Sequence, residues 1–134
     1  MKIVDCLNYC DFTDWRYQPL FDDLSDHVGV LSVEEAKMIS TYMEIFRDKE
    51  GIWMSYPDDP LDNSINVERN GGEDGLYEWS GLLHYLVEKY RVDPPGEFRE
   101  HVATQVTSGA DLQTQAEKLI ILKLERAKKR RPPR

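Results

Sequence analysis

The sequence predicts an α+β fold that is mostly helical, with four to five helices and a small antiparallel β-hairpin. Apolar residues recur at helical spacing in several segments, most clearly over residues 76–91. Over residues 52–69, short aromatic or alternating stretches are bounded by Gly and Pro, as is typical of strands. A chain of 134 residues can form one core and is too short for two ordinary domains. We therefore expect a single compact acidic domain over residues 1–125 and a basic, mobile C-terminal tail over residues 126–134.

The first third of the chain predicts two helices. Residues 1–18 follow no single period, and their apolar beginning fits either a short strand or the first turn of a helix. Apolar residues at helical spacing predict a short helix over about residues 20–28. A capping box at Ser32 and Glu35 begins a second helix over residues 33–49. Its buried stripe should consist of Ala36, Ile39, Met43 and Phe46.

The middle of the chain predicts the hairpin and a central helix. Residues 52–56 and 64–69 should pair as antiparallel strands around a loop at 57–63. An N-terminal strand, if it forms, should join this hairpin. Residues 76–91 should be the central core helix, with Asp74 as its cap. The residues expected on its polar side are Glu78, His84, Glu88, Lys89 and Arg91.

Two more helices are predicted after the proline pair at residues 94–95. The first is about ten residues long and should turn Phe98, Val102 and Val106 toward the core. Asp111 should cap the last helix, which carries apolar residues from Leu112 to Ala127 before the basic tail.

Charge is distributed very unevenly along the chain. The whole chain has a net charge of −8. Residues 1–116 hold 23 acidic and 9 basic side chains, a net charge of −14. Residues 117–134 hold 2 acidic and 8 basic side chains, a net charge of +6. Such an acidic body should attract basic protein surfaces and repel nucleic acid. The basic tail should have the opposite preference and attract nucleic acid.

The sequence indicates a soluble, cytoplasmic protein without a membrane partner. Apolar runs are far shorter than the roughly 18 residues that a membrane span needs. Asp5 interrupts the N-terminus before a signal-peptide core can form. Two cysteines are fewer than a small secreted domain usually carries.

No catalytic constellation is evident. Cys6 and Cys10 lack the second ligand pair that a zinc site needs. The pairs Glu97–His101 and His84–Glu88 are at i,i+4 spacing and are interpreted as structural surface pairs. Neither a phosphate-binding glycine loop nor a nucleophile elbow is present. We therefore predict no enzyme activity, no catalytic residue, no metal and no cofactor.

The composition favours a non-enzymatic interaction protein whose acidic body binds a basic protein partner. A small, acidic chain without motifs is similar in general character to immunity proteins, antitoxin-like inhibitors and small phage-encoded accessory proteins. The predicted contact residues are Asp11, Asp14, Trp15, Asp58, Asp59 and Asp62.

Two alternatives remain open. The first is a nucleic-acid or ribonucleoprotein accessory factor anchored by the basic tail. Its contact residues would be Arg126, Lys128, Lys129, Arg130, Arg131 and Arg134. The second is a metal-dependent hydrolase that uses the acidic loop 58–74, because gathered carboxylates can hold calcium or magnesium.

Overall fold

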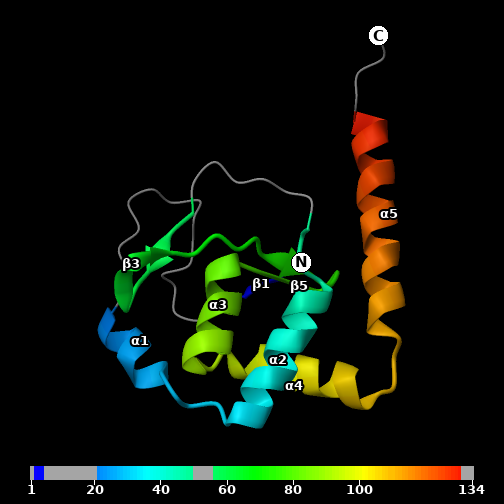
Figure 1. The fold of residues 1–134 in the computed structure, drawn as a ribbon. Coiled ribbons are helices and arrows are strands. Elements are labelled where there is room, and N and C mark those ends of the chain that lie inside the picture. Colours follow the sequence, from blue (N-terminus) through cyan, green and yellow to red (C-terminus); the bar gives the residue numbers. More distant parts are fainter. Residues whose placement is uncertain (1, 5–20, 50–55, 131–134) are drawn as a thin grey trace.

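The structure, a computed structural model, describes residues 2–4, 21–49 and 56–130 (Figure 1). The helices in these ranges are α1 (Phe21–His27), α2 (Val33–Ile45), α3 (Gly81–Tyr90), α4 (Gly96–Thr107) and α5 (Leu112–Arg130). The strands are β1 (Lys2–Val4), β2 (Asp58–Asp59), β3 (Asp62–Asn66), β4 (Gly72–Glu73) and β5 (Tyr77–Trp79). The prediction of a mostly helical α+β fold with a small antiparallel hairpin is confirmed.

The strands form two separate sheets. In the first, β5 is central: β1 pairs with it in parallel, and β4 pairs with its other edge antiparallel. In the second, β2 and β3 form the antiparallel hairpin. The N-terminal strand therefore joins β5 and not the hairpin, contrary to prediction. The hairpin strands also differ, because β2 and the start of β3 occupy the predicted loop at 57–63, and most of the predicted strand 52–56 lies outside the described residues.

The central helix begins five residues later than the sequence predicted. Residues 77–79 form β5, because ladder hydrogen bonds to strands on both sides outweigh the local helical pattern. Ser80 is the N-cap of α3, and its Oγ accepts a hydrogen bond from the Leu83 amide at 3.0 Å. Asp74 does not cap this helix, and its carboxylate has other partners, described below.

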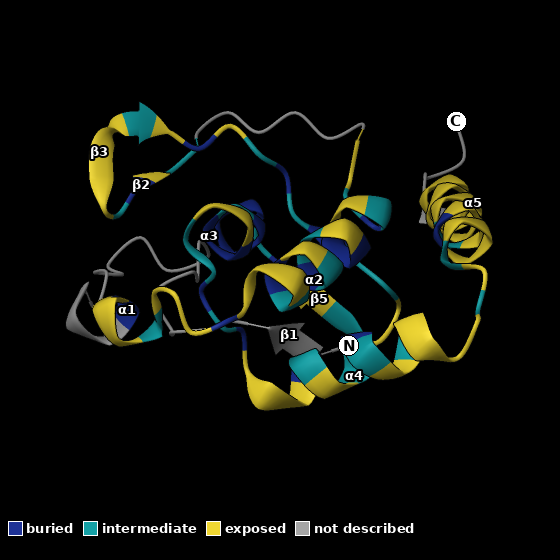
Figure 2. Cartoon of the chain, turned by 60° about the horizontal axis from the view of Figure 1, so that its bottom comes forward, coloured by how far each residue is buried: buried dark blue, intermediate teal, exposed yellow. Residues whose placement is uncertain are grey.

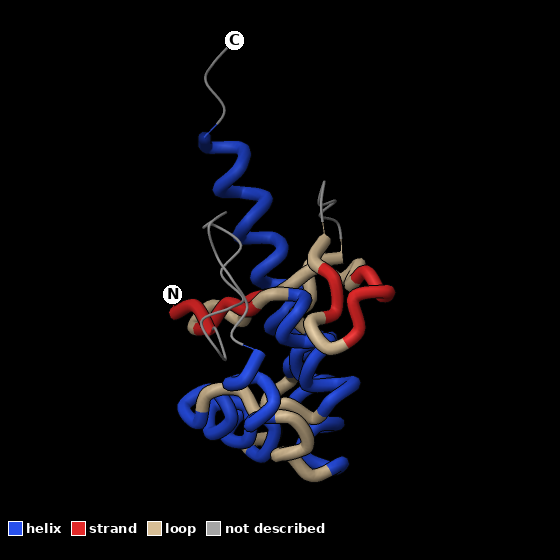
Figure 3. Tube along the Cα trace, turned by 90° about the vertical axis from the view of Figure 1, so that its left-hand side faces the viewer, coloured by secondary structure: helices blue, strands red, loops and turns tan. Residues whose placement is uncertain are grey.

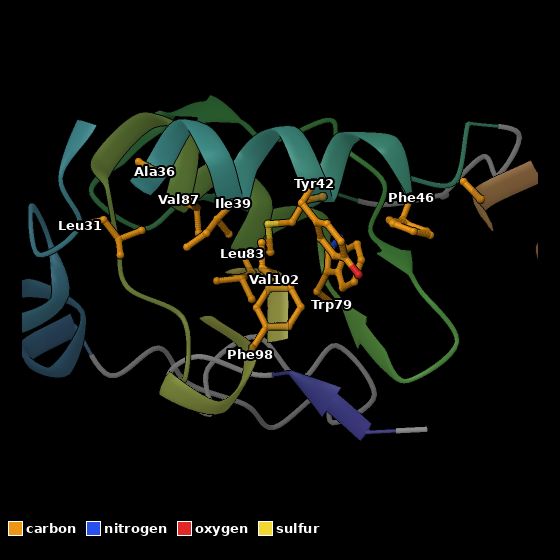
Figure 4. Close-up of a cluster of buried hydrophobic side chains, with 12 residues drawn as sticks. Leu31, Ala36, Ile39, Tyr42, Phe46, Trp79, Leu83, Val87, Phe98 and Val102 are labelled. Atoms are coloured by element: carbon orange, nitrogen blue, oxygen red, sulfur yellow. The ribbon is translucent and has the colours of Figure 1, made fainter. Parts of the chain in front are cut away.

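Most of helix α3 is buried, and its exposed residues, Glu88 and Lys89, lie in its last turn (Figure 2). The main core lies between α2, α3, α4 and β5 and is drawn in Figure 4. At its centre, the rings of Tyr42, Trp79 and Phe98 lie in mutual contact, with centroids 5.4–6.4 Å apart. A second cluster packs on the other side of α3 and consists of Leu24, Val67, Leu82, Leu86 and Val92. His84, predicted on a polar face, is therefore only 1% exposed.

The chain crosses the beginning of α3 at very short range. A Cβ atom at Gly81 would lie 1.7 Å from the Arg69 carbonyl oxygen, and one at Gly71 would lie 2.0 Å from the Trp79 carbonyl oxygen. Only glycine permits this approach, which fixes the segment leading from the hairpin to β4 against α3.

The remaining helices agree with prediction in part. The cap of α2 at Ser32 is confirmed, since Oγ accepts from the Glu35 amide at 3.1 Å, but α2 ends at Ile45 and not at residue 49. In α4, Phe98 and Val102 are buried, whereas Val106 is exposed. Asp111 caps α5 as predicted, with its Oδ1 accepting from the Thr114 amide. Helix α5 continues to Arg130, so it includes the first five residues of the predicted tail.

Candidate functional site

The β2–β3 hairpin is fastened to α3 by one buried carboxylate. Asp59 has a fully buried side chain, and its Oδ2 accepts hydrogen bonds from the hydroxyls of Tyr85 and Tyr90 at 2.7 and 2.6 Å. Its Oδ1 accepts from the backbone amides of Leu61 and Asp62 at 2.8 and 3.2 Å. One side chain thus closes the turn of the hairpin and attaches it to the end of the central helix.

The electrostatics keep Asp59 ionised. Burial disfavours its charge, but the hydrogen bonds from Tyr90, Tyr85 and the two amides outweigh burial and lower the pKa of this carboxyl. Burial and the nearby Asp59 charge in turn raise the pKa of Tyr90 to about 12. Lys89 completes the cluster, with Nζ 3.6 Å from Asp59 Oδ2 and 5.3 Å from the ring centroids of both tyrosines.

The tip of this hairpin presents two carboxylates to solvent. Asp58 and Asp62 are exposed, and the side chain of Leu61 between them is 41% exposed. Asp58 accepts from the Asn66 side-chain amide at 3.0 Å, and Asp62 accepts from the Ser64 hydroxyl at 2.6 Å. Both donors are neutral. Neither aspartate has a salt-bridge partner among the described residues, so the tip keeps its negative charge.

The predicted contact residues therefore occupy different environments. Asp58 and Asp62 lie at the exposed tip, and Asp59 lies inside, where it supports them. Asp11, Asp14 and Trp15 lie outside the described residues. Burial of Asp59 was not evident from the sequence because its tyrosine partners follow 26 and 31 residues later.

A second buried carboxylate, Asp74, joins three elements. Its Oδ2 accepts from the Tyr42 hydroxyl at 2.5 Å and from His101 Nε2 at 2.7 Å. Its Oδ1 accepts from the amides of Leu76 and Tyr77 at 2.9 and 2.7 Å. Burial and the Asp74 carboxylate raise the pKa of Tyr42. Sequence reasoning missed this cluster, although Asp74 followed by a glycine is a turn signal.

The hydrogen bonds of Asp74 hold three elements of the fold together. Four donors occupy both oxygens of the carboxylate, which attaches the β4–β5 turn to α2 and α4. His101 is largely buried and directed at Asp74, and it is not the surface partner of Glu97 that the spacing suggested. With Nε2 donating to Asp74, activation of a protein nucleophile by His101 would need that nucleophile beside Nδ1. The contacts found among the described residues include none there.

His84 lies beside Ser40 but does not form a catalytic triad. Its Nε2 is 3.3 Å from Ser40 Oγ and 3.9 Å from Glu88 Oε2. Its Nδ1 is buried without a hydrogen-bond partner in the described part of the chain, so no acid orients the ring. Burial, followed by the charge of Arg69, lowers the pKa of His84 to about 4. This histidine is a neutral core residue at pH 7.

The acidic loop 58–74 does not act as one cluster. Asp59 and Asp74 belong to two separate hydrogen-bond groups. Within residues 2–4, 21–49 and 56–130, no three His, Cys, Asp or Glu side chains gather closely enough to hold a metal ion. Cys6 and Cys10 lie outside these ranges.

The basic residues predicted to bind nucleic acid continue along α5. Arg126, Lys128 and Lys129 are exposed on this helix, and Arg130 is its last residue. Arg131 and Arg134 lie outside the described ranges. Over the part of the chain that the structure describes, no helix has the length and apolar character needed to cross a bilayer.

Comparison of the chain with protein-family models, with curated proteins and with solved structures gives no match.

Proposed function

We propose that this protein is a non-enzymatic interaction protein of the inhibitor, immunity or accessory-factor type, acting in the cytoplasm, and that its β2–β3 hairpin binds a basic protein partner. One observation supports this proposal above all. Asp58 and Asp62 are exposed and without a cationic partner among the described residues, on a hairpin that Asp59 holds in place. An acidic contact that is already ordered loses little conformational freedom when it binds.

The surroundings of the hairpin suit a cationic partner. Leu61 supplies an apolar contact between the two carboxylates, and interfaces combine an apolar centre with a polar rim. Residues 1–116 carry a net charge of −14, which should steer a basic protein toward this surface and raise its association rate. The charge excess thus favours encounter, and the ordered hairpin favours a specific contact.

Affinity capture with matched variants tests the proposal. The bait is the full chain, incubated with nuclease-treated lysate at low salt and eluted with increasing salt. The test variant is Asp58→Asn/Asp62→Asn. The control is Glu34→Gln/Glu100→Gln, which removes the same charge from exposed positions on α2 and α4. Wild type and control should capture a basic protein that salt releases. The test variant should capture at least about tenfold less of this protein.

Two results would contradict the proposal. The first is equal capture by the test variant and wild type, because the hairpin would then contribute nothing. The second, seen in a parallel capture from untreated lysate, is a partner that is retained there and absent from the nuclease-treated lysate, which would favour the nucleic-acid role predicted for the basic tail.

A further inference from the structure

Helix α5 is attached to the body along only part of its length. Ala116 is 6% exposed, and Leu112 and Leu119 pack beside it against the main core. The attachment extends to Lys123, whose Nζ lies 2.9 Å from Glu73 Oε1. Figures 1 and 3 show the rest of the helix extending beyond the body.

A second apolar stripe on α5 lies on a different side of the helix from this attachment. Ile120, Leu124 and Ala127 follow one another at i, i+4 and i+7, and so share one side of the helix, about 80° around from the first stripe. Ile120, Ile121 and Leu124 are 47%, 55% and 54% exposed. Three of the ten exposed large hydrophobic residues in the described ranges therefore gather on this side of α5, and such a concentration marks an interaction surface.

We propose that the stripe formed by Ile120, Ile121, Leu124 and Ala127 pairs with the same stripe of a second copy, with the two α5 helices antiparallel. Charge complementarity within the chain selects this occupant. Residues 117–134 have a net charge of +6 and residues 1–116 a net charge of −14. The antiparallel arrangement sets the basic end of each helix beside the acidic body of the other copy, whereas a parallel arrangement sets two basic ends together.

The position of the stripe within α5 fits this symmetry. Residue 121 is the midpoint of Leu112–Arg130, so a two-fold axis near it aligns the whole length of both helices, about 28 Å. With the axis at residue 122, one residue from this midpoint, Leu124 of one copy packs beside Ile120 of the other. The same register places Lys128 within about one residue of Glu117 of the second copy, an ion pair at the end of the apolar stripe.

Measurement of mass in solution tests the pairing. Sedimentation equilibrium of the full chain over a range of micromolar concentrations should show twice the monomer mass. Leu124→Glu should raise the dissociation constant at least about tenfold, because it buries a carboxylate in the stripe. Leu122→Glu is the matched control: Leu122 is 46% exposed but lies on the opposite side of α5, so this variant should remain a dimer. Circular dichroism of both variants checks that each one folds.

A charge exchange tests the antiparallel register. Lys128→Glu should weaken the dimer, and the double variant Glu117→Lys/Lys128→Glu should restore it. A wild-type chain that stays monomeric at all concentrations, as it would if α5 served a membrane, a nucleic acid or another protein, overturns the proposal. Equal weakening of the dimer by Leu122→Glu and Leu124→Glu overturns the proposed stripe. Failure of the double variant to restore the dimer overturns the antiparallel register.

Discussion

Mild acid should destabilise this protein in part through His84. Burial lowers the pKa of this histidine from an ordinary 6.5 to about 4. Below pH 6.5, the unfolded chain binds a proton at this position that the folded chain does not bind until about pH 4. The stability that His84 contributes is therefore complete above pH 6.5 and is lost as pH falls between these two values.

The size of this effect follows from the two pKa values. Each pKa unit corresponds to about 1.4 kcal/mol, so the full difference amounts to about 3 kcal/mol by pH 4, and the part between pH 7 and pH 5 is about 2 kcal/mol. Against the roughly 5–15 kcal/mol that stabilises a typical domain, this is a large fraction. Arg69 acts in the same direction as burial, whereas Glu44 and Glu88 oppose it without cancelling it.

Urea unfolding of wild type and His84→Gln at pH 7 and pH 5 measures the effect. Glutamine keeps a polar side chain opposite Ser40 Oγ and binds no proton in this range. Tryptophan fluorescence, to which the buried Trp79 contributes, reports unfolding. All other ionisable groups are common to both proteins, so their contributions cancel in the comparison. Between pH 7 and pH 5, the free energy of unfolding of the variant should fall by about 2 kcal/mol less than that of wild type. Equal losses would refute the role assigned to His84.

Three further substitutions test the packing. Gly81→Ala should destabilise the fold by more than about 2 kcal/mol in thermal or urea unfolding, because its Cβ would meet the Arg69 carbonyl oxygen, although alanine ordinarily favours helices. Unchanged stability would exclude the close crossing. Tyr42→Phe removes a charge-assisted hydrogen bond to Asp74 and should cost about 2 kcal/mol, measured in the same way. No loss would show that the remaining donors suffice. Asp59→Asn should release the hairpin, seen as faster hydrogen exchange at the Leu61 amide, whereas unchanged exchange would contradict its anchoring role.

Local signals in the sequence were sufficient to predict most helices. The caps at Ser32 and Asp111 are hydrogen bonds between a side chain and an amide three residues later, so a few neighbouring residues are enough to predict them. Strand β5 could not be predicted in this way. Its residues continue the apolar period of α3, and what makes them a strand is pairing with β1, whose residues lie 75 positions earlier.

The environments of charged and polar residues were harder to predict than the helices. A helix packed on one side has a polar face, but α3 is covered on both sides, and His84 is therefore buried. Asp59 and Asp58 are adjacent in an acidic run, and the tyrosine hydroxyls of α3 bind the inner carboxylate and not the outer one. Long-range partners, and not local composition, decide which acid anchors the hairpin and which faces solvent.

The parallel pairing of β1 with β5 has a consequence for the order of folding. Each residue of β1 pairs with a residue 75 positions later, as Lys2 does with Tyr77, so this edge of the sheet forms only when the long chain between them has closed into a loop. Closing a loop of that length is costly in entropy, whereas β4 and β5 meet across a short turn. The short antiparallel pair should therefore form early with α3, and β1 should be added late. In the native protein, β1 should also be the first strand to detach, briefly leaving one edge of β5 without its neighbour while the core stays intact.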